Sequence, residues 1–392
     1  MNEQKKLVPK LRFPEFRDWD GWEVKPLQKL FSIGSGRDYK HLSSGNFPVY
    51  GSGGYMLSVD DFLYDGESVC IGRKGTINNP MFLTGKFWTV DTLFYTHSFQ
   101  QCLPKFVFAV FQKIDWLKHN EAGGIPSLSK TIIEKIKTAV PAIPEQQKIA
   151  DCLSSLDELI AAQARKVDAL KTHKKGLMQQ LFPCEGETQP RLRFPEFSNA
   201  GEWSPKTIGQ LGEVVTGSTP STAKPEYYGG DRHFVSPADI SDNRFIEKTK
   251  TTLTELGFLE TRPIEGNSIL FVCIGSTIGK IAQNRQECAT NQQINAVMPN
   301  SENSEEFVYY ALSGIAGKVA NIAGRQAVPI VNKSLFSSIG LAVPKLPEQK
   351  RIAHCLSSLD ELVFAATQKL ETLKTHKKGL MQQLFPTPEI DL

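Results

Sequence analysis

The sequence predicts an α+β protein made of two similar halves, in which two globular segments of mixed α/β structure are joined by two long helices. Three observations predict this fold. A segment of 40 residues occurs twice, a short leader stands before each globular segment, and the globular segments share anchor residues in the same order. Because an internal repeat indicates that one structural unit has been built twice, we expect the two halves to share a framework.

The repeated segment spans residues 144–183 and 347–386, and 29 of its 40 aligned positions are identical. Its apolar residues recur in alternating steps of four and three, interrupted at Gln163 and Lys174, which is the a/d pattern of a coiled coil. Proline and glutamate begin each copy and a proline ends it, as helix boundaries favour. Each copy therefore predicts a helix of ~35 residues, roughly 50 Å long at 1.5 Å per residue.

Two matching seams in one chain favour pairing of the helices with each other over packing of each helix on its own globular segment. The residues that we expect to form this pairing are Leu153, Leu156, Ile160, Val167, Leu170, Leu356, Leu359, Val363, Leu370 and Leu373.

The leader LRFPEF at 11–16 returns at 192–197, and Trp22 returns as Trp203 at the same offset of 181. The polar segment between the first helix and the second leader contains Pro and Gly, which suits a connector. The predicted division is the first leader and globular segment at 1–143, the first helix at 144–183, the connector with the second leader and globular segment at 184–346, the second helix at 347–386, and a tail at 387–392.

The globular segments have diverged more than the helices but keep common anchors. Gly36 matches Gly217 at offset 181, whereas VCIG at 69–72 matches VCIG at 272–275 at offset 203, which predicts a net insertion of 22 residues between them in the second segment. We interpret this divergence as one shared task for the helices and two different tasks for the globular segments. A recent duplication or gene conversion of the helix region is an alternative explanation for the identity of the helices.

The composition sets limits on the class of protein. The net charge is +3, so any basic surface must come from local arrangement rather than from a bulk excess of Lys and Arg. The amino terminus has no apolar signal core and no run reaches the length of a membrane span, which predicts a cytoplasmic protein without membrane contact. Seven scattered cysteines without a CxxC pair predict reduced, mostly buried thiols rather than disulfides or a zinc site.

No motif in the sequence predicts catalysis. The segment GSTIGK at 275–280 lacks the residue spacing of a phosphate-binding P-loop, and Asn79-Pro80 lacks the second proline of an amino-methyltransferase motif. The histidines show neither metal-ligand spacing nor a nucleophile context. The sequence therefore predicts a chain without a catalytic residue, a metal site or a bound cofactor.

The remaining candidates are basic and amide side chains in predicted loops, where recognition usually lies. Arg and Lys suit phosphate and guanine, while Asn and Gln suit adenine. For any one of these residues a solvated surface position is the alternative. The candidates are Arg37, Lys40, His41, Arg73, Lys74 and Asn78 in the first segment, and Lys224, Arg232, His233, Arg244, Ser276, Lys280, Asn291, Gln292, Gln293, Arg325 and Gln326 in the second.

Over essentially its full length the chain resembles the specificity subunit (HsdS) of type I restriction–modification systems. The resemblance rests on the duplicated helix segment, on the two leaders, and on the openings LQKLFSIGSG and IGQLGEVVTGSTPS of the globular segments. It also rests on their endings, which run through GGIPSLSK and RQAVPIVNK into PEQ. Order and spacing agree across both halves, which makes the match specific.

The resemblance implies that each globular segment is a target recognition domain that reads one half of a split, asymmetric sequence in double-stranded DNA. It implies that the two helices pair antiparallel as a spacer. Two methyltransferase subunits, which use S-adenosylmethionine, would dock on this chain, and ATP-dependent restriction subunits, with Mg, would join them. The chain itself would be non-catalytic. The resemblance also places Ser218, Thr219 and Ser221 near DNA, and the first segment departs from this pattern at Gly36-Arg37-Asp38.

Two other functions stay open from the residues alone. The first is a coiled-coil scaffold that binds proteins and has no DNA specificity. The second is a stand-alone adenine methyltransferase, against which the missing cofactor motifs argue.

Overall fold

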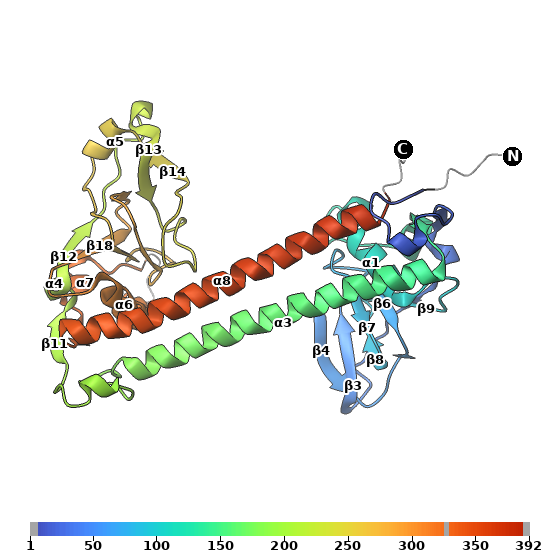
Figure 1. The fold of residues 1–392 in the computed structure, drawn as a ribbon, viewed down its shortest axis with the longest axis horizontal. Coiled ribbons are helices and arrows are strands. Elements are labelled where there is room, and N and C mark those ends of the chain that lie inside the picture. The colour runs from blue at the N-terminus through green and yellow to red at the C-terminus, as the bar shows by residue number, and fades with distance from the viewer. Residues whose placement is uncertain (1–6, 325–328, 387–392) are drawn as a thin grey trace. The chain divides into compact units, whose positions relative to one another are not determined.

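The computed structural model describes residues 7–324 and 329–386, which fall into two compact units (Figure 1). Unit 1 comprises Met1–Arg165 and Thr367–Leu392, and unit 2 comprises Lys166–Ala366. Each unit therefore contains one globular part, the beginning of one long helix and the end of the other. The predicted domain boundaries treat each long helix as a separate part, and they stay a prediction.

Unit 1 combines short strands with a few helices. Its leader forms the 3-10 turn η1 (Pro14–Phe16). The elements that follow are β1 (Glu23–Pro26), η2 (Leu27–Lys29), β2 (Ser32–Ser35), β3 (Ser44–Gly51), β4 (Gly54–Val59), β5 (Tyr64–Asp65), β6 (Ser68–Gly72), β7 (Met81–Leu83), β8 (Lys86–Thr89), β9 (Leu93–His97), α1 (Pro104–Lys113), η3 (Trp116–His119), α2 (Lys130–Lys135), β10 (Lys137–Val140) and the start of α3 (Ile143–Leu181).

Unit 2 repeats this order with additions. Its leader forms η4 (Pro195–Phe197). The elements that follow are β11 (Ser204–Thr207), α4 (Ile208–Leu211), β12 (Gly212–Thr216), η5 (Pro225–Tyr227), β13 (Tyr228–Val235), β14 (Thr251–Leu253), α5 (Glu255–Leu259), β15 (Ile269–Val272), β16 (Ile281–Gln283), β17 (Ala289–Thr290), β18 (Ile294–Pro299), α6 (Glu305–Ile322), α7 (Lys333–Ser338), β19 (Gly340–Val343) and the start of α8 (Leu346–Leu384).

Each unit is built on an antiparallel sheet of four strands, in the order β2-β9-β6-β7 in unit 1 and β12-β18-β15-β16 in unit 2. Each unit has a second sheet, which is four-stranded in unit 1, with the order β4-β3-β8-β5, and three-stranded in unit 2, with the order β14-β13-β17. Helices and antiparallel sheets occur in both units, which confirms the predicted α+β class and the internal repeat.

The strand register corrects one equivalence that was predicted from the sequence. Gly72 on β6 lies opposite Leu93 on β9, and Val272 on β15 lies opposite Ile294 on β18. Because Leu93 and Ile294 hold equivalent positions in their sheets, Gly72 corresponds to Val272, at an offset of 200 rather than 203. The shared letters VCIG are therefore not structurally equivalent: in unit 2 the last three follow the strand and enter a turn. In unit 2 the strand β15 is formed by the sequence ILFV, and all four of its residues are buried. The position of the strand is therefore determined by backbone pairing and burial, not by matching letters.

The end of each long helix completes the core of the opposite half's globular part. In unit 1 the buried Trp22 lies edge-on against Phe106 and against Phe385, which directly follows α8. In unit 2 Trp203 lies in the same way against Phe307 and against Phe182, at the end of α3. Burying a large aromatic side chain stabilises a fold by a few kcal/mol, so these contacts hold each helix end firmly.

The leader and the Pro-Glu-Gln start of each long helix are joined by equivalent contacts. Arg12 donates to Glu145 through Nε at 2.8 Å and Nη2 at 2.7 Å. In unit 2 Arg193 donates to Glu348 through the same two atoms, both at 2.7 Å. Paired guanidinium–carboxylate bonds are among the strongest polar contacts in proteins, and they explain why both motifs are repeated.

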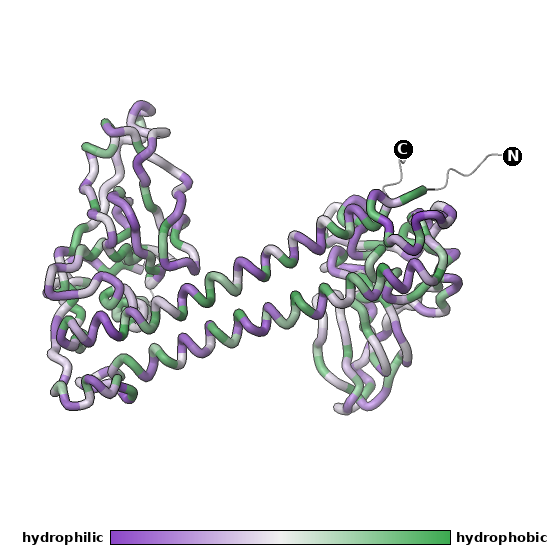
Figure 2. The backbone as a smooth tube through the Cα atoms, in the orientation of Figure 1, coloured by the Kyte–Doolittle hydropathy of each residue, from purple (hydrophilic) through white to green (hydrophobic). Residues whose placement is uncertain are grey.

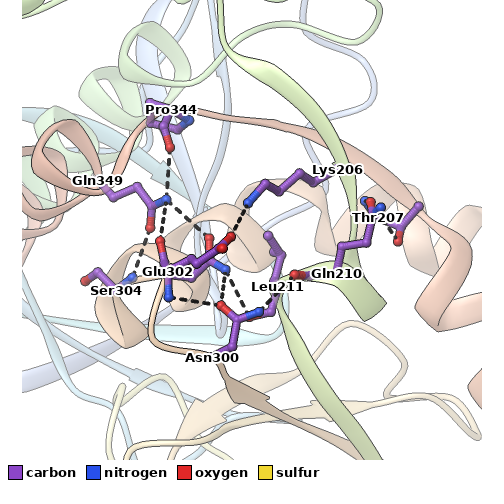
Figure 3. A network of polar contacts seen from close by, with 10 residues as sticks. Lys206, Thr207, Gln210, Leu211, Asn300, Glu302, Ser304, Pro344 and Gln349 are labelled. Carbon is purple, nitrogen blue, oxygen red and sulfur yellow. Dashed lines mark hydrogen bonds and ion pairs between the residues drawn. The ribbon is translucent and has the colours of Figure 1, made fainter.

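The glutamine of the same motif anchors the N-terminus of one helix of the globular part, α1 in unit 1 and α6 in unit 2 (Figure 3). Gln349 accepts from the backbone N–H of Ser304, the N-cap of α6, at 2.9 Å and donates to the Pro344 carbonyl at 2.9 Å. Gln146 makes the matching bonds to the N–H of Leu103, the N-cap of α1, and to the Pro141 carbonyl. Each long helix is thus fixed to its own globular part at its first turn.

The long helices pair antiparallel within each unit, because residues near the start of one contact residues near the end of the other. Lys377 of α8 reaches Asp157 of α3 in unit 1, and Lys174 of α3 reaches Asp360 of α8 in unit 2. Figure 2 shows hydrophilic and hydrophobic residues alternating along both helices. All ten residues predicted to form the pairing are buried or half-buried.

No helix in the described part of the chain is long and apolar enough to span a membrane.

Candidate nucleic-acid interface

In unit 1 the candidate residues lie on loops at one end of the strands of the sheet β2-β9-β6-β7. We call the loops 36–41, 73–78, 90–92 and 121–130 of unit 1 the first loop platform. Backbone hydrogen bonds join them: Gly36 N–H to Leu93, Arg73 N–H to Thr92, Gly75 N–H to Pro126 and Leu128 N–H to Arg73. Loops tied together in this way hold their side chains in fixed positions, which a recognition surface requires.

Unit 2 builds the same arrangement, which we call the second loop platform, from residues 217–221, 273–278, 291–293 and 329–331. Its bonds run from Gly217 N–H to Ile294, Ser218 N–H to Thr290, Cys273 N–H to Gln293, Gly275 N–H to Pro329 and Val331 N–H to Cys273. The two platforms therefore share a backbone design and differ in the side chains that they carry.

A glycine opens each platform because two backbone segments approach closely there. A Cβ added at Gly36 would lie 1.9 Å from the Val90 carbonyl oxygen. At Gly217 it would lie 2.3 Å from the Asn291 carbonyl oxygen. Both distances are far below contact distance, so a side chain at either position would push the first loop away from the sheet edge.

The first loop platform carries cations around a hollow of about 910 Å³. Exposed Arg73 and Lys74 line it together with Lys130, and the carboxylates of Asp91 and Glu121 stand among them. A second hollow, of about 670 Å³, is lined by Lys40, Tyr55 and Met56 and shares Asp91 and Thr92 with the first. The two hollows therefore adjoin each other, and the basic side chains that line them suit contact with phosphate.

The other candidates of unit 1 lie on the same loops. Arg37 is exposed, and its carbonyl accepts from the Trp88 indole N–H at 2.8 Å. The ring of His41 lies edge-on to the Trp88 ring at 5.8 Å, and Asn78 is exposed at the end of its turn. The structure therefore brings Arg37, Lys40, Arg73 and Lys74 to one edge of the unit.

The second loop platform carries amides and hydroxyls instead of cations. Thr219 donates to the side-chain carbonyl of Gln292 at 2.7 Å, and Gln293 makes a long bond of 3.4 Å to the Ile274 carbonyl. Ser218 accepts from the Arg262 backbone N–H, and Ser276 is exposed on the turn after β15. Exposed amides and hydroxyls can donate and accept at once, which suits base edges more than phosphates.

Several candidates of unit 2 are held by neighbours within the unit instead. Arg232 pairs with Glu255 and Glu287, and its hydrogen bond to Glu255 holds the pKa of that carboxyl below its usual range. Lys280 donates to the Ile240 carbonyl at 3.1 Å. The Lys280 bond holds the loop between β13 and β14, whereas Arg232 joins β13 to α5 and to the segment before β17. Both side chains lie outside the second loop platform.

Lys224 and Arg244 are also engaged. Lys224 donates to the Tyr227 hydroxyl at 2.8 Å, and the backbone carbonyl of Ser221 accepts from the Lys224 N–H. Arg244 donates to Gln283, Ser357 and Tyr310. Arg325 and Gln326 lie outside the described residues.

Sequence reasoning missed several residues at these edges. Lys130 was not among the predicted residues, although it lines the larger hollow. Tyr55 and Met56, exposed by 63% and 48%, stand at the tip of the β3–β4 hairpin. Arg262 is exposed beside Ser218, and its guanidinium donates to the Thr216 carbonyl. The glycine-rich run GSGG before Tyr55 was the available signal for the hairpin.

Among residues 7–324 and 329–386, no group of His, Cys, Asp and Glu is arranged to hold a metal ion. Burial raises the pKa of the thiols of Cys70, Cys102, Cys273 and Cys288 to about 12, so they carry almost no thiolate at neutral pH. Such thiols are inert as nucleophiles.

Comparison with known proteins was made by sequence and by structure. A family profile described as the type I restriction modification DNA specificity domain matches the chain twice, over residues 20–172 and 200–375. The type I restriction enzyme HindI specificity subunit of Haemophilus influenzae is 31% identical over 168 residues, which are 42% of this chain and 36% of that protein. The chain thus matches about a third of the length of this relative.

Two further matches extend over most of the chain. The type I restriction enzyme EcoR124I/EcoR124II specificity subunit of Escherichia coli is 28% identical over 325 residues, which cover 80% of this chain and 75% of that protein. The solved type I restriction–modification S subunit from M. genitalium has a TM-score of 0.66 at 15% identity, and the match covers 97% of this chain and 100% of that one. At this identity the second match shows a shared fold.

Proposed function

Because the chain belongs to the family of type I restriction–modification DNA specificity domains, we propose that it is the DNA-specificity subunit of a type I restriction–modification enzyme. In this role each globular part is a target recognition domain that reads one half of a bipartite site in double-stranded DNA. The long helices provide the spacer and the docking surface for partner subunits.

The observation that carries this proposal is the pair of loop platforms, which share backbone hydrogen bonds and differ in side chains. A common backbone presents both surfaces in the same way, while cations in unit 1 and amides in unit 2 select different contacts. Two unlike readers in one chain favour an asymmetric target.

The partners and cofactors in this proposal follow from the family. Two methyltransferase subunits dock on the repeated helix segments and bring S-adenosylmethionine to an adenine, and restriction subunits with ATP and Mg join the complex. The chain contributes no catalytic residue.

The experiment is to express the chain with its methyltransferase partner and to sequence methylated adenines genome-wide. We expect one gapped, asymmetric motif. The variant Thr219→Ala/Gln292→Ala should relax preference in one half of that motif and leave the other half unchanged, because each lost base contact weakens discrimination by about 1–3 kcal/mol. A methylated motif that is continuous, or in which both halves change together, would contradict the proposal.

The same material separates a specificity subunit from an enzyme. The purified chain with S-adenosylmethionine and DNA should transfer no methyl group, and transfer should begin when the methyltransferase subunit is added. Methyl transfer by the chain alone would show that it is catalytic.

A further inference from the structure

An ion pair lies in the apolar contact between the long helices in each unit. In unit 1 the Lys377 Nζ lies 2.6 Å from the Asp157 carboxylate. In unit 2 Lys174 forms the equivalent ion pair with Asp360. Asp157 and Lys174 recur as Asp360 and Lys377 at the repeat offset of 203, so each helix carries its aspartate toward the start and its lysine toward the end.

Both ion pairs also form hydrogen bonds with the globular part of their own unit. In unit 1 the Lys377 ammonium donates to Gln112 on α1 at 2.8 Å. In unit 2 the Asp360 carboxylate accepts from Tyr310 on α6 at 2.6 Å, and Tyr310 in turn accepts from Arg244. Each pair therefore stands where three helices meet, which restricts its geometry more than a surface ion pair would.

These charges matter because the apolar seams alone leave the helix pairing ambiguous. Helices with nearly the same a/d residues can pair parallel, antiparallel, or shifted by a heptad at similar cost. An in-register parallel pairing would set Lys174 against Lys377 and Asp157 against Asp360, which places like charges together. A heptad shift of the antiparallel pair would move every lysine away from its aspartate. Partly buried charges in a seam penalise such alternatives.

We propose that Asp157, Lys174, Asp360 and Lys377 specify the antiparallel orientation and the register of the two long helices. The apolar seam supplies the attraction, and the four charges select one arrangement. Asp157 and Lys174 also permit α3 of one copy to pair antiparallel with α3 of another. Linkage within one chain favours the internal partner through its high effective concentration.

The orientation is tested with the exchange variant Asp157→Lys/Lys174→Asp, which keeps composition and net charge. Internal antiparallel pairing then meets like charges in both units, whereas α3 of two copies still pairs with opposite charges. We expect the wild-type chain to sediment as a monomer and the exchange variant to form a dimer with a lower Tm. Adding Asp360→Lys/Lys377→Asp should restore opposite charges internally and return the monomer. A variant that stays monomeric with unchanged Tm would overturn the proposal.

The pair in unit 1 provides a second test that leaves Tyr310 untouched. Asp157→Lys should lower the Tm by about 3–6 °C, and the reversed pair Asp157→Lys/Lys377→Asp should recover most of that loss. The matched control is Lys378→Asp, which changes an exposed lysine in the same turn of α8 and should leave the Tm within about 1 °C. Failure of the reversed pair to recover, or an equal loss in the control, contradicts the assignment. Neither test uses DNA or a partner subunit.

Discussion

Arg73 and Lys74 are the exposed cations whose position in unit 1 fits phosphate contact most directly. They follow β6, line the larger hollow with Lys130, and stand on a turn bonded to Thr92 and Pro126 through the backbone. Because the turn is held by main-chain atoms, truncating the two side chains should remove charge without moving the loop.

We therefore expect Arg73→Ala/Lys74→Ala to weaken DNA binding by the assembled complex roughly 10- to 100-fold and to lower the salt dependence of binding by about two units of slope. The measurement is the binding constant from 50 to 200 mM salt. The control Lys135→Ala/Lys137→Ala removes the same charge from exposed positions outside the platform. An unchanged slope in the first variant would remove this turn from the interface.

The buried thiols make stability depend on alkaline pH. Burial raises the pKa of Cys70, Cys102, Cys273 and Cys288 to about 12, whereas an unfolded thiol ionises near ~8.5. Their contribution to stability is therefore complete below pH ~8.5 and is lost as the pH rises toward 12, at about 2 kcal/mol per thiol by pH 10.

We expect the free energy of unfolding in urea to fall between pH 7.5 and pH 10, and a variant with Cys70→Ala and Cys273→Ala to fall less steeply. In the folded protein, iodoacetamide should modify the exposed Cys184 well before these four thiols. Early modification of the four, at a pH where the protein is folded, would contradict their burial.

At the scale of single residues, the sequence indicated which basic side chains are candidates, but not which of them are exposed and which are held by a neighbour. Arg73 and Lys74 were selected as basic side chains in a predicted loop, and they are exposed. Arg232 and Lys280 satisfied the same criterion, yet Glu255, Glu287 and the Ile240 carbonyl hold them. Those partners are distant along the chain, so no local pattern separates an engaged cation from a free one.

At the scale of elements, the structure shows that each leader is joined to the start of a long helix by a buried ion pair. In unit 2 the buried Glu348 accepts two bonds from Arg193 and one from the Trp203 indole N–H. The nearby ion pair of Arg351 and Glu196 is exposed: the two side chains are 43% and 48% exposed. Removing the charge of a buried partner leaves the other charge uncompensated, whereas an exposed pair is already screened by water.

We expect Glu348→Gln to destabilise unit 2 by roughly 3–5 kcal/mol and Glu196→Gln to cost less than about 1 kcal/mol. Urea unfolding of both variants measures the difference, and hydrogen exchange shows whether unit 2 opens first. Equal losses in the two variants would show that burial does not determine the strength of this junction.

The elements also show why some of the fold was predictable. The long helices follow from a periodic pattern that is local to each segment, and the buried seam agrees with it. The equivalence of the two VCIG segments was wrong because four matching letters carry no information about strand register. The packing of Phe385 and Phe182 into the opposite half's globular core was not predicted, since it depends on contacts far apart in the sequence.

For the whole molecule, the proposed function treats the helix pair as the spacer between two readers, and the paired charges determine how its length can be changed. A change in one helix alone separates Lys377 from Asp157, or Lys174 from Asp360, and should disrupt pairing. A change that lengthens both helices equally keeps the seams in phase when it is one heptad long.

We therefore expect a seven-residue insertion after Gln163 in α3, matched by one after Leu370 in α8, to lengthen the gap between the half-sites by about three base pairs. Seven residues add roughly 10 Å of helix, and successive base pairs are ~3.4 Å apart. Both half-sites should stay unchanged, because the loop platforms are untouched. The measurement is the methylated motif in cells that carry the variant and its partner. Insertion into α3 alone is the control and should abolish methylation; an altered half-site with the original gap would exclude the helix pair as the spacer.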